Sequence, residues 1–467
     1  MGEFRPASRG GARLVGAATL VLCATLAFAL GEPPQESPAP PSPHVSLADH
    51  AAFLQLVGLG PEWWRQAAES GHLPTHHATI ARIVVALRKV PGGSWELWCR
   101  DATAPQGDLP RQATVAQWRG EVKRIRPYEL PPAVARRFEL GPLWDVVATP
   151  DGRSAASVHF ITPHIPDAWS KDSPTGQTVR LHGLWLGKDK QHTDWAVGPR
   201  VVWIPQKPAP QLGITADHVR LAAAGFDCSR LDDVRKADRQ PIGQTDREAF
   251  WEMLRATRRL EGPLPGTARP VESVATLLTQ SAHLVGAAVR LTGNIRRITR
   301  IEVTTPLDRR RLGFDHYYQL DMFADLDDTV IRIGGQSPGK TKPRSLHGYY
   351  PVTLCLVDLP SPLAQRFAQG TIDKLHYRAT VEGYLFKNWR YHSDFIAQFG
   401  DEARQVVPLV LPTRLQEWDE PPRDSRLVTT FLAAAIGGIV LVTVVTVALM
   451  RRRDRTARRR LDAMRRE

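Results

Sequence analysis

The hexapeptide GEVKRI at residues 120–125 decides the fold, because the hexapeptide GNIRRI at residues 293–298 repeats its pattern. In both, apolar residues alternate with basic ones after a glycine, which is typical of a half-buried β-strand. A second pair follows in the same order, since VRLHG at 179–183 returns as ATVEG at 379–383. This shared order predicts an internal duplication.

The distances between the matching segments support the duplication. DHAAF at 49–53 resembles DREAF at 246–250, an offset of 197 residues, and each opens a helical pattern. The offset falls to 173 at the first strand and returns to 200 at the fourth. We therefore expect an additional helical segment at 76–105 in the first copy and an additional loop at 334–347 in the second.

Each copy is predicted as a helical lead-in followed by about five strands, with a short helix before the fourth. The expected strands are 116–126, 143–149, 157–162, 178–186 and 200–204 in the first copy, and 287–303, 317–324, 329–333, 352–357, 378–386 and 405–411 in the second. Units of this kind, with a glycine in strand one, resemble OB-fold barrels. The glycine is expected where a small barrel bends sharply and leaves no room for a side chain.

The positive charge of the chain is concentrated at its ends. The formal net charge is +13, of which residues 451–467 contribute +6 and residues 1–30 contribute +2, leaving +5 for the rest. This surplus is small for so long a segment, so the pI near 9.9 does not by itself indicate nucleic-acid binding.

Two apolar stretches account for the basic ends as membrane-topology signals. Residues 427–450 contain no charge over 24 positions, and a helix needs about 20 apolar residues to cross a bilayer. Three arginines precede an apolar run at 14–30 that ends in Ala27-Phe28-Ala29, the pattern of a signal peptide or signal anchor. The positive-inside rule then predicts a single-pass protein of the cytoplasmic (inner) membrane, with its main domains extracytoplasmic and its C-terminal tail cytoplasmic.

The predicted fold class is mainly β with α: two duplicated OB-like five-stranded barrels with helical lead-ins, plus one C-terminal transmembrane helix. The expected parts are a signal peptide or signal anchor at 1–30, a Pro-rich spacer at 31–45, a helical lead-in at 46–110, barrel 1 at 111–211, a helical connector at 212–285, barrel 2 at 286–412, a spacer at 413–426, the transmembrane helix at 427–450 and a basic cytoplasmic tail at 451–467.

The candidate chemical groups favour structural roles. Adjacent histidines in GHLPTHH (71–77) point to different sides of a helix, and DMFADLDD (321–328) lacks the glycine and glutamate of a calcium loop. Asp145 and Asp151 flank a predicted turn, and we favour this interpretation over a role of the two carboxylates in acid–base chemistry. Neither HExxH nor GxGxxG is present. We expect no catalytic residue, no metal and no cofactor, and thiols rather than a disulfide for Cys99, Cys228 and Cys355.

Aromatic and basic residues gather in the hairpin after the fourth strand of each copy. OB barrels bind oligonucleotides or sugars with such residues, by stacking and by phosphate contacts. The alternative is that the aromatic residues belong to the core and the others only fill a hairpin. The candidate binding residues are Trp185, Lys188 and His192 in the first copy and Lys387, Trp389, Arg390 and Tyr391 in the second.

These expectations lead to a membrane-anchored, extracytoplasmic, non-catalytic binding or scaffold protein of the cell envelope. Paired domains between Pro-rich spacers, with an Arg-rich tail, resemble uncharacterised bacterial single-pass envelope proteins. The expected partners are membrane lipid, contacted by the transmembrane helix and basic tail, and an envelope protein or glycan. Nucleic acid is not expected, because the barrels are placed outside the cytoplasm. The alternatives are a nucleic-acid-binding membrane protein that uses the hairpin aromatics and an envelope hydrolase without a linear motif.

Overall fold

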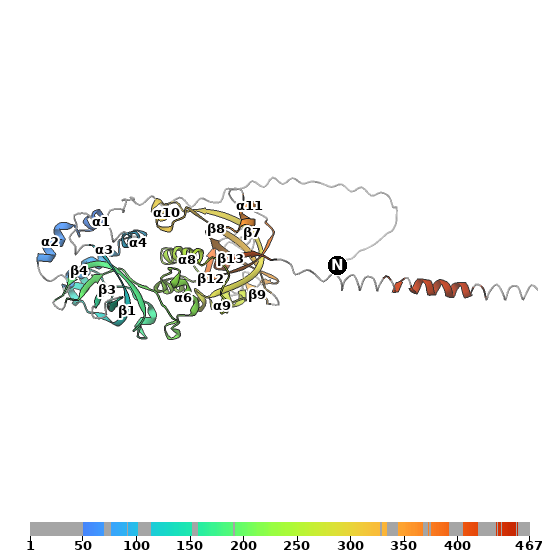
Figure 1. Ribbon diagram of the computed structural model, residues 1–467, viewed down its shortest axis with the longest axis horizontal. Coiled ribbons are helices and arrows are strands. Elements are labelled where there is room, and N and C mark those ends of the chain that lie inside the picture. The colour runs from blue at the N-terminus through green and yellow to red at the C-terminus, as the bar shows by residue number, and fades with distance from the viewer. Residues whose placement is uncertain are drawn as a thin grey trace, which may run out of the picture. The chain divides into compact units, whose positions relative to one another are not determined.

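The computed structural model describes two barrels and the helices around them (Figure 1). The residues described are 50–69, 76–90, 92–100, 114–151, 157–189, 192–326, 329–333, 344–367, 372, 375–391, 405–418, 436, 438–439, 441–453 and 455. All the elements named below belong to one compact unit, Ala48–Glu467.

The first barrel is a ring of five strands with a sixth strand at one edge. Its strands are β1 (Val115–Tyr128), β2 (Leu143–Pro150), β3 (Val158–Thr162), β4 (Thr178–Lys188), β5 (Asp194–Val197) and β6 (Val201–Trp203). The order β1-β2-β3-β5-β4 closes into a ring because β4 also pairs with β1. Within the ring only β3 and β5 run parallel.

The second barrel has the same strand order. Its strands are β7 (Ala288–Glu302), β8 (His316–Asp325), β11 (Tyr349–Leu356), β12 (Tyr377–Tyr391) and β13 (Gln405–Glu417), and a short hairpin of β9 (Ile331–Ile333) and β10 (Arg344–Leu346) is inserted between β8 and β11. The ring is β7-β8-β11-β13-β12, with β11 and β13 parallel. This five-stranded Greek-key arrangement is the OB fold, so the prediction of two OB-like barrels is confirmed.

The two barrels share irregularities as well as topology. The pairing of the first strand slips by one residue at Lys123 in β1 and at Arg296 in β7, which are 173 residues apart. The fourth strand slips at Leu186 in β4 and at Phe386 in β12, which are 200 residues apart. These are the two offsets that the sequence repeat predicts, and a β-bulge retained at equivalent positions supports the duplication.

The first-strand glycines lie where the sequence analysis expects a close backbone approach. A Cβ atom on Gly120 would lie 2.0 Å from the carbonyl oxygen of Thr149, and one on Gly293 would lie 2.3 Å from that of Phe323. Real Cβ atoms do not approach so closely, so glycine is required at both positions.

The fifth strand of the first barrel differs from its prediction. Residues 200–204 are expected to form it, but β5 at Asp194–Val197 closes the ring, and β6 pairs with another part of β4. The second barrel covers both roles with the single long strand β13. Gly198 and Pro199 separate β5 from β6, and proline cannot donate a ladder hydrogen bond.

Helices precede each barrel, connect the two barrels and lie between strands within them. They are α1 (His50–Leu56), α2 (Pro61–Glu69), α3 (His77–Leu87), α4 (Gly92–Arg100), α5 (Pro132–Arg137), η2 (Asp167–Ser170), η3 (Pro210–Leu212), α6 (Ala216–Ala223), η4 (Cys228–Arg230), α7 (Leu231–Lys236), α8 (Arg247–Arg259), α9 (Val274–Leu284), α10 (Pro306–Leu312) and α11 (Ser361–Arg366). The helices η2 and α11 occupy the predicted place before the fourth strand, and α3 supplies the extra helical segment expected in the first copy.

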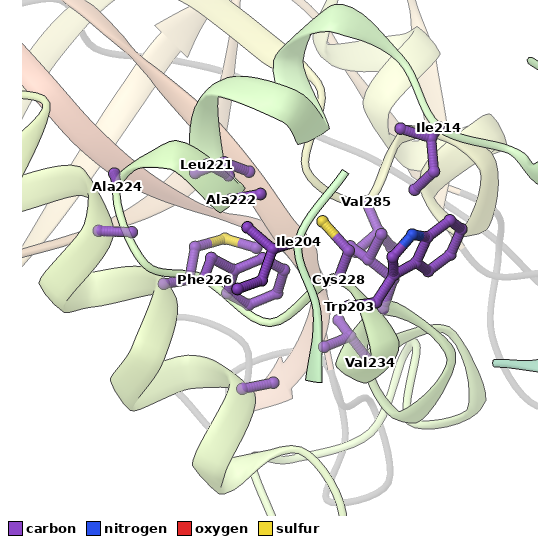
Figure 2. Packing of buried hydrophobic residues seen from close by; sticks show 14 of the residues in the cluster. Trp203, Ile204, Ile214, Leu221, Ala222, Ala224, Phe226, Cys228, Val234 and Val285 are labelled. Carbon is purple, nitrogen blue, oxygen red and sulfur yellow. The ribbon is translucent and has the colours of Figure 1, made fainter. Parts of the chain in front are cut away.

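The connector between the barrels is packed into a continuous hydrophobic core. Figure 2 shows Trp203 and Ile204 of barrel 1 among Leu221, Phe226 and other apolar side chains of the connector. On the other side, Phe250 of α8 contacts Phe386 of β12 with ring centroids 5.6 Å apart. The connector is therefore a structural layer and not a loose tether. The cysteines Cys99, Cys228 and Cys355 are buried and free, as expected.

The predicted transmembrane helix at 427–450 is contradicted by the structure. Described residues between 436 and 455 are helical, but no described helix combines the length and the apolar character needed to cross a bilayer. The fold class is therefore corrected to two OB-like barrels with helices. The predicted signal peptide or anchor and its spacer, residues 1–45, lie outside the described residues, as do most of the spacer before 427 and most of the tail after 450.

Three further expectations depend on that helix and are corrected with it. They are the location in the inner membrane, the periplasmic placement of the barrels and the contact with membrane lipid. Apolar composition alone predicted the helix, and the described helices do not provide it.

Candidate functional site

The predicted binding residues of the first barrel converge on one buried carboxylate. Trp185 donates from Nε1 to Oδ1 of Asp194 at 2.9 Å, and Lys188 donates from Nζ to Oδ2 of Asp194 and to the carbonyl oxygen of His192, both at 3.3 Å. His192 is exposed in the turn with φ 59°, a left-handed conformation. These polar groups therefore hold the hairpin together, and a partner would meet the half-buried Trp185 ring, Lys188 and His192.

The predicted residues of the second barrel differ in their burial. Lys387 is fully buried and forms an ion pair with Asp246. Trp389 is half-buried and donates from Nε1 to the hydroxyl of Thr353 at 3.2 Å, and Arg390 is exposed. Tyr391 ends β12, and its side chain lies outside the described part of the chain.

A cavity of about 880 Å³ lies where barrel 1 faces helices α4, α8 and α10. We call it the arginine cavity, because six arginines line it against one carboxylate, that of Glu96. The arginines are Arg119 of β1, Arg180 of β4, Arg255 and Arg259 of α8, and Arg310 and Arg311 of α10.

The barrel wall of the arginine cavity follows from strand alternation. Val179 and Leu181 point into the barrel core, so Arg180 and His182 point outward between them. In the antiparallel β1–β4 pair, Arg119 lies directly opposite Arg180, and Gln117 lies opposite His182. Two like charges directly opposite each other destabilise a sheet.

The equivalent positions of the second barrel carry an uncharged pair of residues. The two repeat offsets carry Arg119 and Arg180 onto Thr292 and Thr380, which also face each other. Their hydroxyl groups are hydrogen-bonded at 3.2 Å. The opposed arginines are therefore a feature of the first barrel and not a requirement of the fold.

The helical wall of the arginine cavity is partly neutralised. Arg255 donates from Nη1 to Glu96 at 2.5 Å and to the carbonyl oxygen of Arg311 at 3.2 Å. Arg311 is buried and forms ion pairs with Glu248 and, at 3.2 Å, with Asp308. These contacts hold the helical wall in place and neutralise part of its positive charge. Other arginines supply the remaining positive charge of the cavity.

Two arginines on opposite walls retain their charge without a carboxylate partner in the described part of the chain. They are Arg180 of β4 and Arg259 of α8, whose Nη1 donates to the carbonyl oxygen of Ala224 at 3.0 Å. Among the described residues, the carboxylate partner of Arg119 is the exposed Asp151, at 3.4 Å. Surface pairs of this kind contribute little, so Arg119 is available to an incoming anion.

His182 and Cys99 add neutral groups to the arginine cavity. Burial, assisted by the charge of Arg180, lowers the pKa of His182 to about 4, so its ring is neutral near pH 7. Its Nε2 atom is buried and has no hydrogen-bond partner among the described residues. Burial raises the pKa of the Cys99 thiol, which therefore stays protonated. The site is thus suited to binding anions, because guanidinium groups match phosphate oxygens in pairs.

The carboxylates considered in the sequence analysis have separate partners. Asp145 is buried, accepts from Arg126 Nε at 2.9 Å and shares a hydrogen bond with His159 Nδ1 at 2.9 Å. Asp151 is exposed beside Arg119. In the acidic segment after β8, Asp325 pairs with Arg378 at 2.7 Å, whereas residues 327–328 lie outside the described residues.

Residues 334–341, GGQSPGKT, also fit the residue spacing of the P-loop and of GxSxG. They lie outside the described residues, between β9 and β10. Both motifs require a strand that leads into a helix. The next described element is β10, which pairs antiparallel with β9.

The arginine cavity is not predicted from the sequence. The arginines that line the cavity come from four separate segments, which no linear motif connects. The available signals are the opposed Arg119 and Arg180, which the strand register would have revealed, and the run Arg309-Arg310-Arg311.

Comparisons with known proteins identify no family for this chain. No protein-family model and no curated protein matches it. Among solved structures, the single-stranded DNA binding protein from Thermus aquaticus is similar at 12% identity and a TM-score of 0.14, over 66% of this chain and 95% of that one. Fission yeast Pot1 with ssDNA is similar at 7% identity and a TM-score of 0.16, over 69% and 88%. Because these TM-scores are low, the fold assignment rests on the strand pairing.

The exclusion of nucleic acid as a partner is also corrected. It depends on export of the barrels past a transmembrane helix, and the described helices include none that could span a membrane. The expectation of an envelope protein or glycan as partner depends on the same placement.

Proposed function

We propose that this protein binds single-stranded nucleic acid, with the phosphodiester backbone of the strand in the arginine cavity. The observation that carries the proposal is the opposed pair Arg119 and Arg180, placed on a barrel face across from Arg259. Their repulsion costs stability in the free protein, and a phosphate between them would relieve it.

The size and fold of the site agree with this ligand class. The volume of about 880 Å³ falls within the range of roughly 300–1,000 Å³ typical of ligand sites, which is room for a short stretch of one strand. OB barrels bind single strands in positively charged grooves that follow the backbone. The lining carries one carboxylate, that of Glu96, which is already paired with Arg255.

The hairpin residues extend the proposed surface beyond the arginine cavity. Lys188, His192 and Arg390 are exposed and polar, and Trp185 and Trp389 are half-buried. We include them as residues that contact the strand outside the cavity. Lys387 is left out of this surface because it is fully buried.

The test is the binding of a fluorescein-labelled dT20 by the full-length chain, measured by fluorescence anisotropy over a range of salt concentrations. The variant Arg119→Thr/Arg180→Thr installs the residue pair that the second barrel already carries. Because each phosphate contact with a single strand adds about 0.7 to the slope of log K against log salt, losing two contacts should lower that slope by about 1.4.

The matched control is Arg136→Ala/Arg137→Ala, which removes two exposed arginines of α5 that do not line the cavity. The control should keep most of the salt slope. If dT20 does not bind, or if both double variants change the slope equally, the proposal is wrong.

A further inference from the structure

The walls of the arginine cavity also indicate which part of the strand they receive. We infer that the arginine cavity holds consecutive phosphates and keeps the bases outside, so that binding does not depend on sequence; this inference rests on the proposed function. Its basis is the composition of the walls, the position of the nearby aromatic residues and the two-sided placement of the cations.

The arginine cavity offers no aromatic platform for stacking among its described residues. Proteins that bind single strands without sequence preference stack the bases mainly on the exposed faces of aromatic side chains. None of these residues is present among the described residues that line the cavity, and its apolar part is the small segment Ala222–Gly225 with Ile204 and Leu312. His182 contributes a ring, but its Nε2 edge is buried. A base that entered would therefore meet guanidinium, amide and aliphatic groups and no face of Trp, Tyr or Phe among the described residues.

An aromatic residue adjacent to the arginine cavity, Trp203, points into the core. Trp203, next to the lining residue Ile204, is 2% exposed and packs edge-on against Trp169 with ring centroids 5.3 Å apart. Its Nε1 donates to Gln177 at 3.1 Å. Figure 2 shows Trp203 within the apolar cluster. Turning this ring toward the cavity would break both contacts.

The arginines come from both walls of the cavity, so they can contact one anion from two sides. Arg119 and Arg180 come from the barrel, whereas Arg259 comes from α8 on the other wall. Each phosphate of a nucleic-acid backbone carries two unesterified oxygens, so guanidinium groups on both walls can bind it. Bases are uncharged at neutral pH and offer no anionic oxygen to these paired guanidinium groups. The backbone is therefore the part of the strand that the two walls select.

The experiment compares three unlabelled competitors for the full-length chain with labelled dT20 bound. They are dT20 itself, a 20-unit abasic oligonucleotide with the same phosphates, and inorganic polyphosphate of about 20 units. We expect the abasic oligonucleotide to compete within threefold of dT20, and polyphosphate to compete as well. The variants Arg119→Thr/Arg180→Thr and Arg259→Ala should weaken the binding of dT20 and of the abasic oligonucleotide by the same factor. The control Arg136→Ala/Arg137→Ala should not weaken the binding of one oligonucleotide more than that of the other.

The outcomes separate this inference from the proposed function. If the abasic oligonucleotide competes more than 20-fold less well than dT20, while the cavity variants still weaken dT20, the proposed function stands and the inference is wrong. If labelled dT20 does not bind at all, both are wrong. The inference is supported if dT20 and the abasic oligonucleotide compete equally well and if the cavity variants weaken the binding of both to the same extent.

Discussion

Replacing Lys387 by methionine should destabilise the second barrel without reducing nucleic-acid binding. Lys387 is fully buried in β12, and its Nζ donates to the carbonyl oxygens of Ala237 at 3.0 Å and Pro241 at 3.2 Å. It also forms an ion pair with Asp246, which is itself fully buried and accepts from the backbone amide of Gly243 at 2.8 Å. The ammonium group thus attaches the connector to the barrel.

The magnitude follows from what the substitution leaves behind. Methionine fills much the same space but supplies no charge, so Asp246 becomes a buried carboxylate without a counter-charge. Removing one partner of a buried ion pair costs about 3–5 kcal/mol. With a urea m value of about 3 kcal/mol/M, the unfolding midpoint should fall by roughly 1 M or more.

The assay is urea unfolding followed by tryptophan fluorescence, with Lys387→Met/Asp246→Asn as the matched control. The control removes the unpaired charge, so it should recover a large part of the loss. Affinity for dT20, measured where both variants are folded, should stay within twofold of the wild type. A loss of stability below 1 kcal/mol, or a selective loss of dT20 binding in Lys387→Met, would refute the assignment of Lys387 to a structural role.

Three further outcomes are expected. Gly120→Ala places a Cβ atom 2.0 Å from the Thr149 carbonyl oxygen and should reduce stability by at least about 2 kcal/mol in thermal unfolding, whereas Gly141→Ala, with nothing within 4 Å, should be near neutral. Because the pKa of His182 is lowered to about 4 in the folded protein and is about 6.5 when unfolded, the unfolded chain binds the proton first as the pH falls. Stability should therefore decline from pH 6.5 to 4, by up to about 3 kcal/mol from this group, and His182→Gln should show a shallower decline in chemical unfolding at each pH; an unchanged profile would contradict the assignment. Arg119→Thr/Arg180→Thr should leave the free protein as stable as before or more stable, because it removes an opposed pair of like charges, and a clear drop in its melting temperature would argue against that repulsion.

The sequence predicts the barrels well because a strand that is buried on one face must alternate. GEVKRI and GNIRRI combine apolar and basic residues in this way, with one extra basic residue at the bulge positions Lys123 and Arg296. Their glycines mark the close backbone approach found at Gly120 and Gly293. The strand β5 is missed because its four residues, Asp194–Val197, are all buried and show no alternation. A short, fully buried strand lacks the pattern on which the prediction depends.

The site is harder to predict because it depends on contacts between distant segments. Lys387 follows an aromatic run and is followed by Trp389 and Arg390, which favours an exposed hairpin. The connector covers it from about 150 positions earlier in the chain. Similarly, Arg180 and Arg259 come together only when β4 and α8 are placed in the fold. Tertiary packing decides both positions, and a linear pattern does not contain that information.

The arginine cavity is divided between the two halves of the chain. One wall belongs to barrel 1, and the others include α8 and α10 of the second half. If both copies descend from one ancestral unit, that unit had no complete arginine cavity. A chain cut within the connector would carry one part of the cavity on each fragment.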